Sequence, residues 1–168
     1  MSQLAPMPHI ANVDSSERYK SVYLHAGQIF ANCEPTIVTT IVGSCVAVCM
    51  WDEQKGIGGV NHYLLAQAPT GNAPVGRFGN TAIAELVDRL IRLGARRRWL
   101  AAKVFGGAGV MPTLKTAGGG SLGTRNHEIA EELLSSLSIP VVSSDVGGSR
   151  GRKVIFHTDN GTAWVKHL

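Results

Sequence analysis

Short apolar runs separated by glycine, proline and Asn or Asp turns make up most of the chain. Each run is roughly four to eight residues long and is bounded by turn-forming residues, which is typical of β-strands. An Asn160-Gly161 pair separates the last two runs and predicts a β-hairpin there. The predicted strands are Val22–Ile29, Thr36–Ile41, Val46–Trp51, Gly58–Tyr63, Trp99–Phe105, Pro140–Asp145, Lys153–His157 and Thr162–Lys166.

Two stretches instead repeat apolar residues at spacings of three and four, the period of an amphipathic helix. The first covers Thr81–Leu93, with Asn80 or Thr81 as its N-cap and Gly94 as its end. The second covers about His127–Leu137, with Asn126 as its N-cap. Because strands outnumber helices and do not alternate with them, we predict an α+β fold, with a β-rich core of packed mixed sheets and the helices on the outside.

The length and composition fit one globular unit. The chain has 168 residues, 44% of them hydrophobic and 17% charged, which is enough apolar material for a single core. We predict a flexible N-terminal arm over 1–19 and one domain over 20–168. The sequence contains no apolar run long enough to span a membrane, and its N-terminus lacks the basic start and apolar run of a secretory signal. We therefore expect a cytoplasmic protein.

The net charge of +4 comes partly from two basic clusters, Arg96–Arg98 and Arg150–Lys153. Such clusters either bind an acidic partner or are solvated, and cations after a helix are also favoured by its dipole. The role of Arg150 and Arg152 stays open from the sequence. Aromatic residues are only 6% of the chain, which argues against a stacking platform for single-stranded nucleic acid.

Cofactor and metal motifs have little support in the sequence. The stretch Gly118–Gly123 has the spacing of a dinucleotide-binding loop, but residues Thr113–Ala117 before it read as a loop and not as the strand that such a site needs. The sequence contains no phosphate-binding P-loop pattern, and its histidines lack the spacing of a metal site. We expect no cofactor and no metal.

The three cysteines are expected to be free thiols, because their number is odd and no CxxC pair occurs. Cys49 lies in an apolar run and fits a buried core thiol, and Cys33 fits a loop. Cys45 differs, because the small residues Gly43 and Ser44 precede it where a strand must stop. Backbone N–H groups left free at such a junction would lower the thiol pKa and bind an oxyanion.

A thiol nucleophile also needs a base, and His62 is the candidate. The runs Val46–Trp51 and Gly58–Tyr63 are joined by a short segment with glycine, so they are expected to form a hairpin. That hairpin would bring His62 back beside Cys45. For an arbitrary Cys–His pair, a structural role remains the stronger alternative.

Several blocks in order along the chain resemble the CheD family, the chemoreceptor glutamine deamidases of prokaryotic chemotaxis. The similarity covers about Val22–Lys166. The matching blocks are Thr39–Val48 with its GSCVAV, Asp52–His62, Lys103–Met111 with its KVFGGAGVM, the G-x-R-N stretch Gly123–Asn126, and Ile139–Gly161.

The resemblance implies a catalytic site and a reaction. The family's cysteine falls on Cys45 and its histidine on His62. Its threonine, six residues before the cysteine, falls on Thr39, which is next to Thr40. Thr39 would hold the imidazole of His62 by a hydrogen bond from its hydroxyl group. A Cys45 thioester would form on a receptor glutamine and hydrolyse to glutamate, with backbone N–H groups near Gly43, Ser44 and Cys45 stabilising the oxyanion. The family is also similar in fold to the cysteine–histidine toxin deamidases.

The implied partners are the cytoplasmic helices of methyl-accepting chemotaxis receptors and a CheC-type phosphatase, with no nucleic acid and no insertion into the membrane. Two alternatives stay open. The chain could be a regulatory module that binds receptors or CheC without catalysis, or it could hydrolyse receptor methyl esters with the same Cys–His pair. The sequence does not say which receptor glutamines are modified, or which oligomeric state the protein has.

Overall fold

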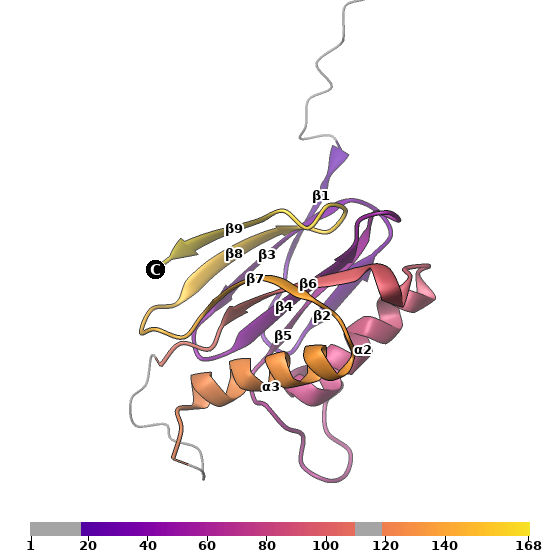
Figure 1. The fold of residues 1–168 in the computed structure, drawn as a ribbon. Coiled ribbons are helices and arrows are strands. Elements are labelled where there is room, and N and C mark those ends of the chain that lie inside the picture. Colours follow the sequence, from indigo (N-terminus) through magenta and orange to yellow (C-terminus); the bar gives the residue numbers. More distant parts are fainter. Residues whose placement is uncertain (1–17, 110–118) are drawn as a thin grey trace, which may run out of the picture.

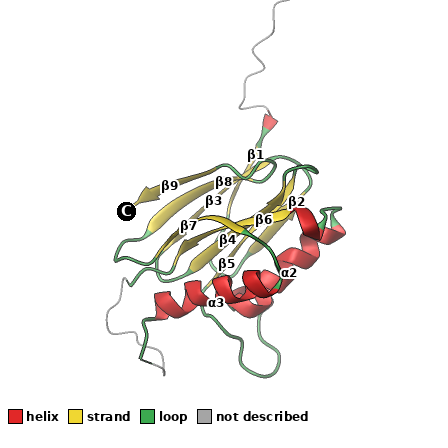
Figure 2. Cartoon of the chain, viewed as in Figure 1, coloured by secondary structure: helices red, strands yellow, loops and turns green. Residues whose placement is uncertain are grey.

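The computed structural model describes residues 18–109 and 119–168, and in these ranges nine strands form two sheets, with two α-helices on one side (Figures 1 and 2). In Figure 1 the four-stranded sheet is the upper layer, the five-stranded sheet the middle layer and the helices the lower layer. The elements are β1 (Lys20–Tyr23), β2 (Ile29–Asn32), β3 (Thr36–Val42), β4 (Val46–Asp52), β5 (Ile57–Tyr63), η1 (Val75–Arg77), α2 (Gly79–Arg92), η2 (Arg97–Trp99), β6 (Leu100–Gly106), α3 (Leu122–Ser136), β7 (Val141–Val146), β8 (Arg152–His157) and β9 (Ala163–His167).

Both sheets are mixed, which confirms the predicted α+β class. The smaller sheet has the order β1-β3-β8-β9 and the larger one β2-β5-β4-β6-β7. The β1/β3 and β6/β7 pairs are parallel, and the other pairs are antiparallel. The likeness to the toxin deamidase fold stays a prediction.

Two hydrophobic cores hold the three layers together. One lies between the five-stranded sheet and the helices and includes Val48, Leu86 and Leu134. The other lies between the two sheets and includes Ala47, Cys49 and Phe156. Strands β4 and β5 contribute to both cores and are buried along their whole length. This explains why the sequence of β4 is a continuous apolar run, because a strand covered on both faces has no polar face to show.

The predicted strand Val22–Ile29 is wrong as a single element. It is split into β1 and the start of β2 by a turn at residues 24–28, in which Gly27 has φ +83°. The two strands belong to different sheets, so the turn carries the chain from one layer to the other. The remaining predicted strands are confirmed with shifts of one or two residues at their ends.

Both predicted helices exist, but both N-caps were wrong. Helix α2 begins at Gly79 after Phe78, with no side-chain cap. A Cβ on Gly79 would lie 2.8 Å from the ring of Tyr63, so the helix approaches β5 more closely than another residue would allow. Its end is confirmed, with Gly94 at φ +109°.

Helix α3 begins at Leu122, about a turn earlier than predicted. The Ser121 side chain accepts a hydrogen bond from the backbone N–H of Thr124 and is the true N-cap. Asn126 therefore lies inside the helix and is fully buried, which leaves its side chain free for contacts with other elements.

The predicted hairpin between β8 and β9 is confirmed. Its loop is longer than a two-residue turn, since the His157 N–H bonds the Thr162 carbonyl and the Gly161 N–H bonds the His157 carbonyl. Gly161 takes a positive φ of +76°, and Asn160 does not.

Parts of three sequence predictions fall outside the described residues. These are the first seventeen positions of the predicted arm over 1–19, the loop Thr113–Ala117, and the last two residues of the block Lys103–Met111. Within the described ranges, no helix has the length and apolar character needed to cross a membrane.

Candidate active site

Cys45 and His62 lie on the same face of the five-stranded sheet. In the β4/β5 ladder Ala47 pairs with His62, and Cys45 stands two residues before Ala47. Side chains two apart along a strand share a face, so Cys45 is the diagonal neighbour of His62. Both face the space between the sheets, where Cys45 packs against the inter-sheet core. The hairpin predicted from the sequence is confirmed, and it places His62 at the end of the β4/β5 ladder that leads to Cys45.

The ring of His62 is held in one orientation by Thr40. Thr40 Oγ1 lies 2.8 Å from His62 Nδ1, and it donates its own proton to the Leu24 carbonyl at 2.8 Å. A hydroxyl has one proton to give, so its oxygen accepts the hydrogen bond from Nδ1–H. The proton of neutral His62 is thereby assigned to Nδ1, which leaves Nε2 with its lone pair.

The prediction that Thr39 makes this contact is wrong. Successive side chains of a strand point to opposite faces. Thr40 points inward from β3 and is buried, whereas Thr39 is half-buried on the outer face, between Tyr23 of β1 and Ile155 of β8. The spacing in the sequence did not distinguish two adjacent threonines, because which of them points inward is set by the pairing of β3.

The backbone of His62 is also fixed. Its carbonyl accepts from the Gly27 N–H at 2.7 Å, and its N–H donates to the Gln28 carbonyl at 3.1 Å. The turn at 24–28 therefore holds His62 by both backbone groups and, through the Leu24 carbonyl, by its ring. The segment that was wrongly predicted as continuous strand is the support of the histidine.

Burial makes the resting pair neutral. The pKa of His62 is lowered to about 4, first because the ring is desolvated and second because His25 is nearby. Burial also raises the pKa of the Cys45 thiol, and only its own backbone N–H acts in the opposite direction. The expectation of a lowered thiol pKa is therefore wrong for the resting protein. The thiol needs to transfer its proton to a base when it reacts.

All three backbone carbonyls of the loop Gly43–Cys45 accept hydrogen bonds. The Gly43 carbonyl accepts from the Ala108 N–H and the Cys45 carbonyl from the Gly107 N–H, both at 2.9 Å. Among the residues that the structure describes, neither Ser44 nor Cys45 donates its backbone N–H to another backbone carbonyl. This arrangement is consistent with the oxyanion role predicted for the loop, which stays a prediction.

Asn126 joins the cysteine segment to the histidine segment. Its Nδ2 donates to the carbonyls of Ser44 and Leu64, both at 2.8 Å. Its backbone carbonyl accepts from the hydroxyl of Tyr63 at 2.6 Å. One buried side chain on α3 thus links, by hydrogen bonds, the residue before Cys45 to the second residue after His62. Sequence reasoning assigned Asn126 to a helix cap, and the only signal for another role was its place in the block Gly123–Asn126.

Glycine allows the backbones around this loop to approach closely. A Cβ on Gly106 would lie 2.2 Å from the Cys45 carbonyl oxygen, and one on Gly123 would lie 2.4 Å from that of Ala108. Neither place has room for a side chain, so the glycine blocks after β6 and at the start of α3 shape the site.

Comparisons with known proteins support the resemblance found in the sequence. The sequence profile described as CheD chemotactic sensory transduction matches residues 64–167. The chain is 50% identical over 147 residues, 88% of this chain and 84% of the relative, to the probable chemoreceptor glutamine deamidase CheD 1 of Anaeromyxobacter dehalogenans (strain 2CP-C). It is 38% identical over 151 residues, 89% of this chain and 96% of the relative, to the probable chemoreceptor glutamine deamidase CheD of Sulfurimonas denitrificans (strain ATCC 33889 / DSM 1251).

The chain belongs to the CheD family. The profile match begins two residues after His62 and leaves the Cys45 segment out. A match of 147 residues in a chain of 168, by contrast, necessarily spans both Cys45 and His62.

The other two cysteines of this CheD family member are not placed for the same chemistry. Cys49 is completely buried, and burial raises the pKa of its thiol strongly. Cys33 is exposed and lies at the other end of the molecule. The sequence interpretation of Cys49 as a core thiol and Cys33 as a loop thiol is confirmed.

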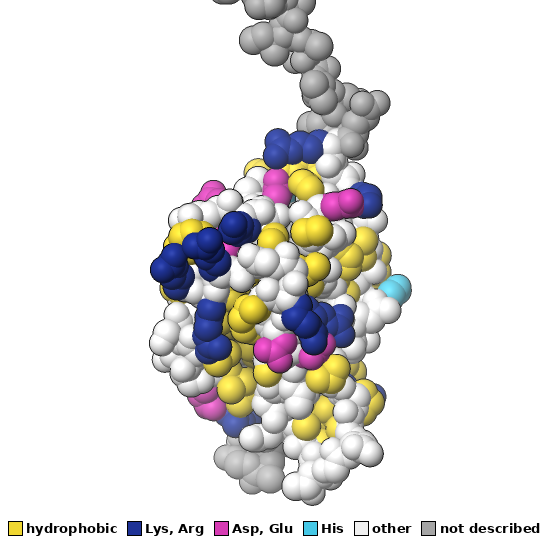
Figure 3. All heavy atoms as spheres, turned by 90° about the vertical axis from the view of Figure 1, so that its right-hand side faces the viewer, with side chains coloured by type: hydrophobic (Ala, Val, Ile, Leu, Met, Phe, Trp, Pro, Cys, Tyr) yellow, Lys and Arg dark blue, Asp and Glu magenta, His cyan; other side chains and the backbone are white. Residues whose placement is uncertain are grey.

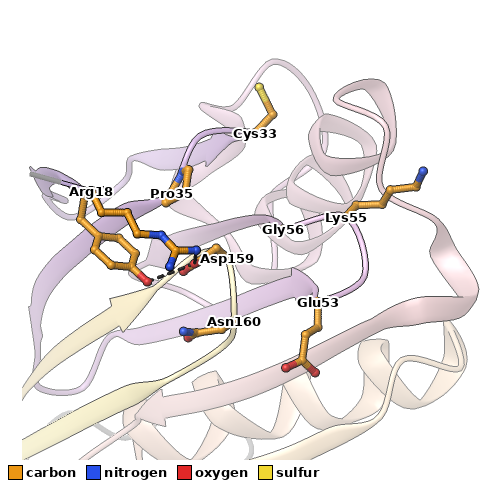
Figure 4. A pocket seen from close by; sticks show the side chains of 9 residues that line it. Arg18, Cys33, Pro35, Glu53, Lys55, Gly56, Asp159 and Asn160 are labelled. Atoms are coloured by element: carbon orange, nitrogen blue, oxygen red, sulfur yellow. Dashed lines mark hydrogen bonds and ion pairs between the residues drawn. The ribbon is translucent and has the colours of Figure 1, made fainter. Parts of the chain in front are cut away.

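A hollow of about 400 Å³ lies at that other end (Figure 4). There Asp159 accepts a hydrogen bond from the Tyr19 hydroxyl at 3.0 Å and forms an ion pair with Arg18 at 3.6 Å. The hollow is lined by Glu53 and Lys55, just beyond the end of β4. Cys45 precedes the start of β4, and seven residues of strand span roughly 20 Å. The hollow is therefore separate from the Cys45–His62 site.

The basic clusters have structural contacts in this CheD fold. Arg152 is buried, with Nε bonded to Asp145 at 2.9 Å and Nη2 to the Gly147 carbonyl at 2.8 Å. Arg150 is exposed and donates to the Leu168 carbonyl at 2.8 Å. The guanidinium groups of Arg96 and Arg98 lie against the Trp99 ring. On the side shown in Figure 3, Lys and Arg side chains are interspersed with acidic and hydrophobic ones, so this side is not uniformly basic.

The part of the chain that the structure describes contains no group of three or more His, Cys, Asp or Glu side chains placed to hold a metal ion.

Proposed function

We propose that this protein is a chemoreceptor glutamine deamidase in which Cys45 is the nucleophile and His62 the base. The relatives' names supply the activity and the class of substrate. The observation that carries the catalytic assignment is the hydrogen-bond chain from His62 Nδ1 through Thr40 to the Leu24 carbonyl. This chain leaves Nε2 as the basic nitrogen of a histidine that shares a face with Cys45.

In the first step, Cys45 Sγ attacks the side-chain carbonyl carbon of a glutamine and gives its proton to His62 Nε2. A C–S bond forms, and the carbonyl electron pair moves to oxygen. The N–H groups of Ser44 and Cys45 are the proposed donors to that oxyanion. Concerted transfer suits this pair, because the resting thiol and imidazole are both neutral.

In the second step, the imidazolium protonates the amide nitrogen. The electron pair on the oxyanion re-forms the carbonyl, the C–N bond breaks, and ammonia departs to leave a thioester on Cys45. The low pKa of His62 makes its imidazolium a strong acid for this transfer. Water then attacks the thioester and gives its proton to His62. The C–S bond breaks, the imidazolium returns its proton to the Cys45 sulfur, and the glutamine has become a glutamate. None of these steps uses a metal or a redox cofactor.

Two residues have proposed positioning roles. Thr40 fixes the tautomer of His62, and Asn126 sets the distance between the two segments that carry the reacting groups. Thr39 is not part of this proposal, because its side chain is on the other face of β3. A cytoplasmic location, the receptor helices as substrate and a CheC-type partner complete the proposal.

The proposal is tested by incubating the protein with a purified chemoreceptor cytoplasmic fragment and following the conversion of glutamine to glutamate by peptide mass spectrometry. We expect conversion with wild type and with Cys33→Ala, and none with Cys45→Ala. Cys33→Ala is the matched control, because it removes an exposed thiol at the far end of the molecule. Equal conversion by wild type and Cys45→Ala would refute the assignment. Release of methanol from a methylated fragment, without deamidation, would favour the methyl-esterase alternative.

A further inference from the structure

The outer face of the four-stranded sheet carries a continuous row of exposed and half-buried side chains. Strand register aligns Tyr23 of β1 with Thr39 of β3, Thr39 with Ile155 of β8, and Ile155 with Trp164 of β9. We call these four residues the outer row. Trp164 is 64% exposed and Tyr23 48%, although both are large and aromatic. In the layers that the structure describes, the helices cover only the other sheet.

A basic rim borders the outer row on one side. The next row of side chains consists of Ile41, Lys153 and Lys166, which pair in register across β3, β8 and β9. Ile41 is 44% exposed and stands two residues before Gly43, so the rim lies at the end of the sheet that leads to Cys45. None of the strands β1, β3, β8 and β9 contains an Asp or a Glu. The face is therefore apolar along the row and cationic along its rim.

The dimensions of the outer row suit an α-helix laid across the strands. Neighbouring strands lie about 4.8 Å apart, so the row spans roughly 14 Å, the length of about nine helical residues. A helix of that length presents its apolar side chains as a stripe. Aromatic side chains such as Trp and Tyr are the ones that most often carry binding energy in an interface.

We propose that the outer row binds an amphipathic helix of the protein substrate, in which acidic residues border the apolar stripe on the side facing Lys153 and Lys166. This inference rests on the proposed function. It assigns substrate docking to a surface on the opposite face of β3 from Thr40 and His62. A second copy of the chain fits this face less well, because its strands β1, β3, β8 and β9 offer no acidic residue to pair with Lys153 and Lys166.

The test compares Trp164→Glu and the double variant Lys153→Glu/Lys166→Glu with wild type. Two matched controls lie elsewhere on the surface: Val142→Glu on β7, which is also an exposed apolar position, and the exposed Arg97→Glu in η2. Each protein is assayed with a purified chemoreceptor cytoplasmic fragment and with a short glutamine-containing peptide too small to reach the outer row. Thermal unfolding confirms that each variant is folded.

We expect KM for the receptor fragment to rise about tenfold or more in Trp164→Glu and in the double lysine variant, with kcat within about twofold of wild type. Activity on the short peptide and both control variants should be unchanged. Added salt should weaken fragment binding by wild type more than by the double lysine variant, since salt screens the rim. An unchanged KM in both outer-face variants would overturn the proposal.

A failure of the proposed function can be distinguished from a failure of the docking proposal. If wild type does not deamidate the fragment, docking is read from direct binding of the fragment to Cys45→Ala with and without Trp164→Glu. Binding that is lost with Trp164→Glu supports docking, and binding that is unaffected overturns it. Two other results would also overturn it. A wild-type dimer that Trp164→Glu converts to a monomer would show that a second copy of the chain covers the outer row. Trp164-dependent binding only to vesicles with anionic lipid would show that the outer row binds a membrane surface.

Discussion

The two ends of the space between the sheets differ in what they hold. At one end, a hollow of about 400 Å³ is lined by charged side chains such as Arg18 and Asp159, which are tied by an ion pair at the surface. At the other end, Cys45 packs against the inter-sheet core, and hydrogen bonds fix His62 by its ring and both backbone groups. The hollow is lined by neither Cys45 nor His62. The two ends therefore offer different features to test, a hollow without the proposed nucleophile and base at one end and an oriented histidine near a thiol at the other.

The largest expected difference between the ends is the effect of removing the base. His62→Ala should lower kcat/KM for the receptor fragment by roughly 10²–10⁴-fold, because general acid–base catalysis contributes about that much. Asp159→Ala, which removes the central carboxylate of the hollow, should leave kcat/KM within about twofold of wild type. Steady-state assays of both variants check this. A large loss in Asp159→Ala with little loss in His62→Ala would reverse the assignment of the two ends.

Asn126 tests whether the rigidity of the Cys45 end matters. Asn126→Ala removes both amide hydrogen bonds and should lower kcat by roughly 10–100-fold with a smaller change in KM, since small misplacements of reacting groups are costly. It should also reduce the free energy of unfolding by about 1–3 kcal/mol, because buried carbonyls lose their donor. Asn160→Ala, at the exposed edge of the hollow, is the matched control. It should leave kcat unchanged and reduce the free energy of unfolding less than Asn126→Ala does, because it removes only one exposed hydrogen bond, from the Thr162 N–H.

A positioning role for Asn126 predicts more than a loss of stability. At a temperature where Asn126→Ala remains fully folded, kcat should still be low, and the reaction of Cys45 with a small electrophile should be altered. If kcat returns to the wild-type value under those conditions, Asn126 has only a structural role.

The adjacent threonines compare the two faces of β3 directly. Thr40→Val keeps the shape of the side chain but removes the acceptor for His62 Nδ1–H, so we expect kcat to fall by roughly tenfold. Thr39→Val should leave kcat unchanged, because its hydroxyl lies on the outer face. Nitrogen chemical shifts of His62 should show one Nδ1-protonated tautomer in wild type and a mixture in Thr40→Val. A loss confined to Thr39→Val would restore the prediction from sequence spacing.

The smallest expected effect is on the pH dependence. The acidic limb of kcat/KM should have its midpoint near the His62 pKa of about 4, below the usual 6.5, because His62 acts as a base only when neutral.

The same pKa shift predicts a pH dependence of stability. Unfolded His62 takes up a proton as the pH falls through 6.5, whereas folded His62 stays neutral until the pH approaches about 4. The free energy of unfolding should therefore decrease as the pH falls across that window. His62→Gln should lack this pH-dependent contribution to the free energy of unfolding, which urea titrations measure. An acidic limb of kcat/KM with its midpoint near 6.5 would contradict the assignment of His62 as a desolvated base.

Much of this arrangement could be predicted from the sequence, for physical reasons. The apolar runs of β4 and β5 and the glycine-containing turn between them predict the hairpin that puts His62 at the Cys45 end of β4. The family resemblance pointed to the same pair. The spacing of apolar residues predicted the helices α2 and α3, and the Asn160-Gly161 pair predicted the hairpin of β8 and β9.

What the sequence did not reveal depends on contacts between distant segments. Thr40 is distinguished from Thr39 only by the face that β3 turns toward the larger sheet. The role of Asn126 depends on the packing of α3 against the loop at Ser44, and a local pattern could only suggest a helix cap. The raised pKa of Cys45 follows from burial in the folded protein, whereas the sequence showed only the small residues before it.

The identity of the nucleophile is tested most directly by trapping the covalent intermediate. Wild type is mixed briefly with the chemoreceptor fragment, quenched with acid, digested and examined by mass spectrometry for a thioester on each cysteine. We expect an adduct on the peptide that contains Cys45, with the cross-link on Cys45 and not on Cys49. It should accumulate before the glutamate residue appears in the receptor fragment. Deamidation that proceeds with no adduct on Cys45, or with an adduct on Cys33 or Cys49, would contradict the assignment.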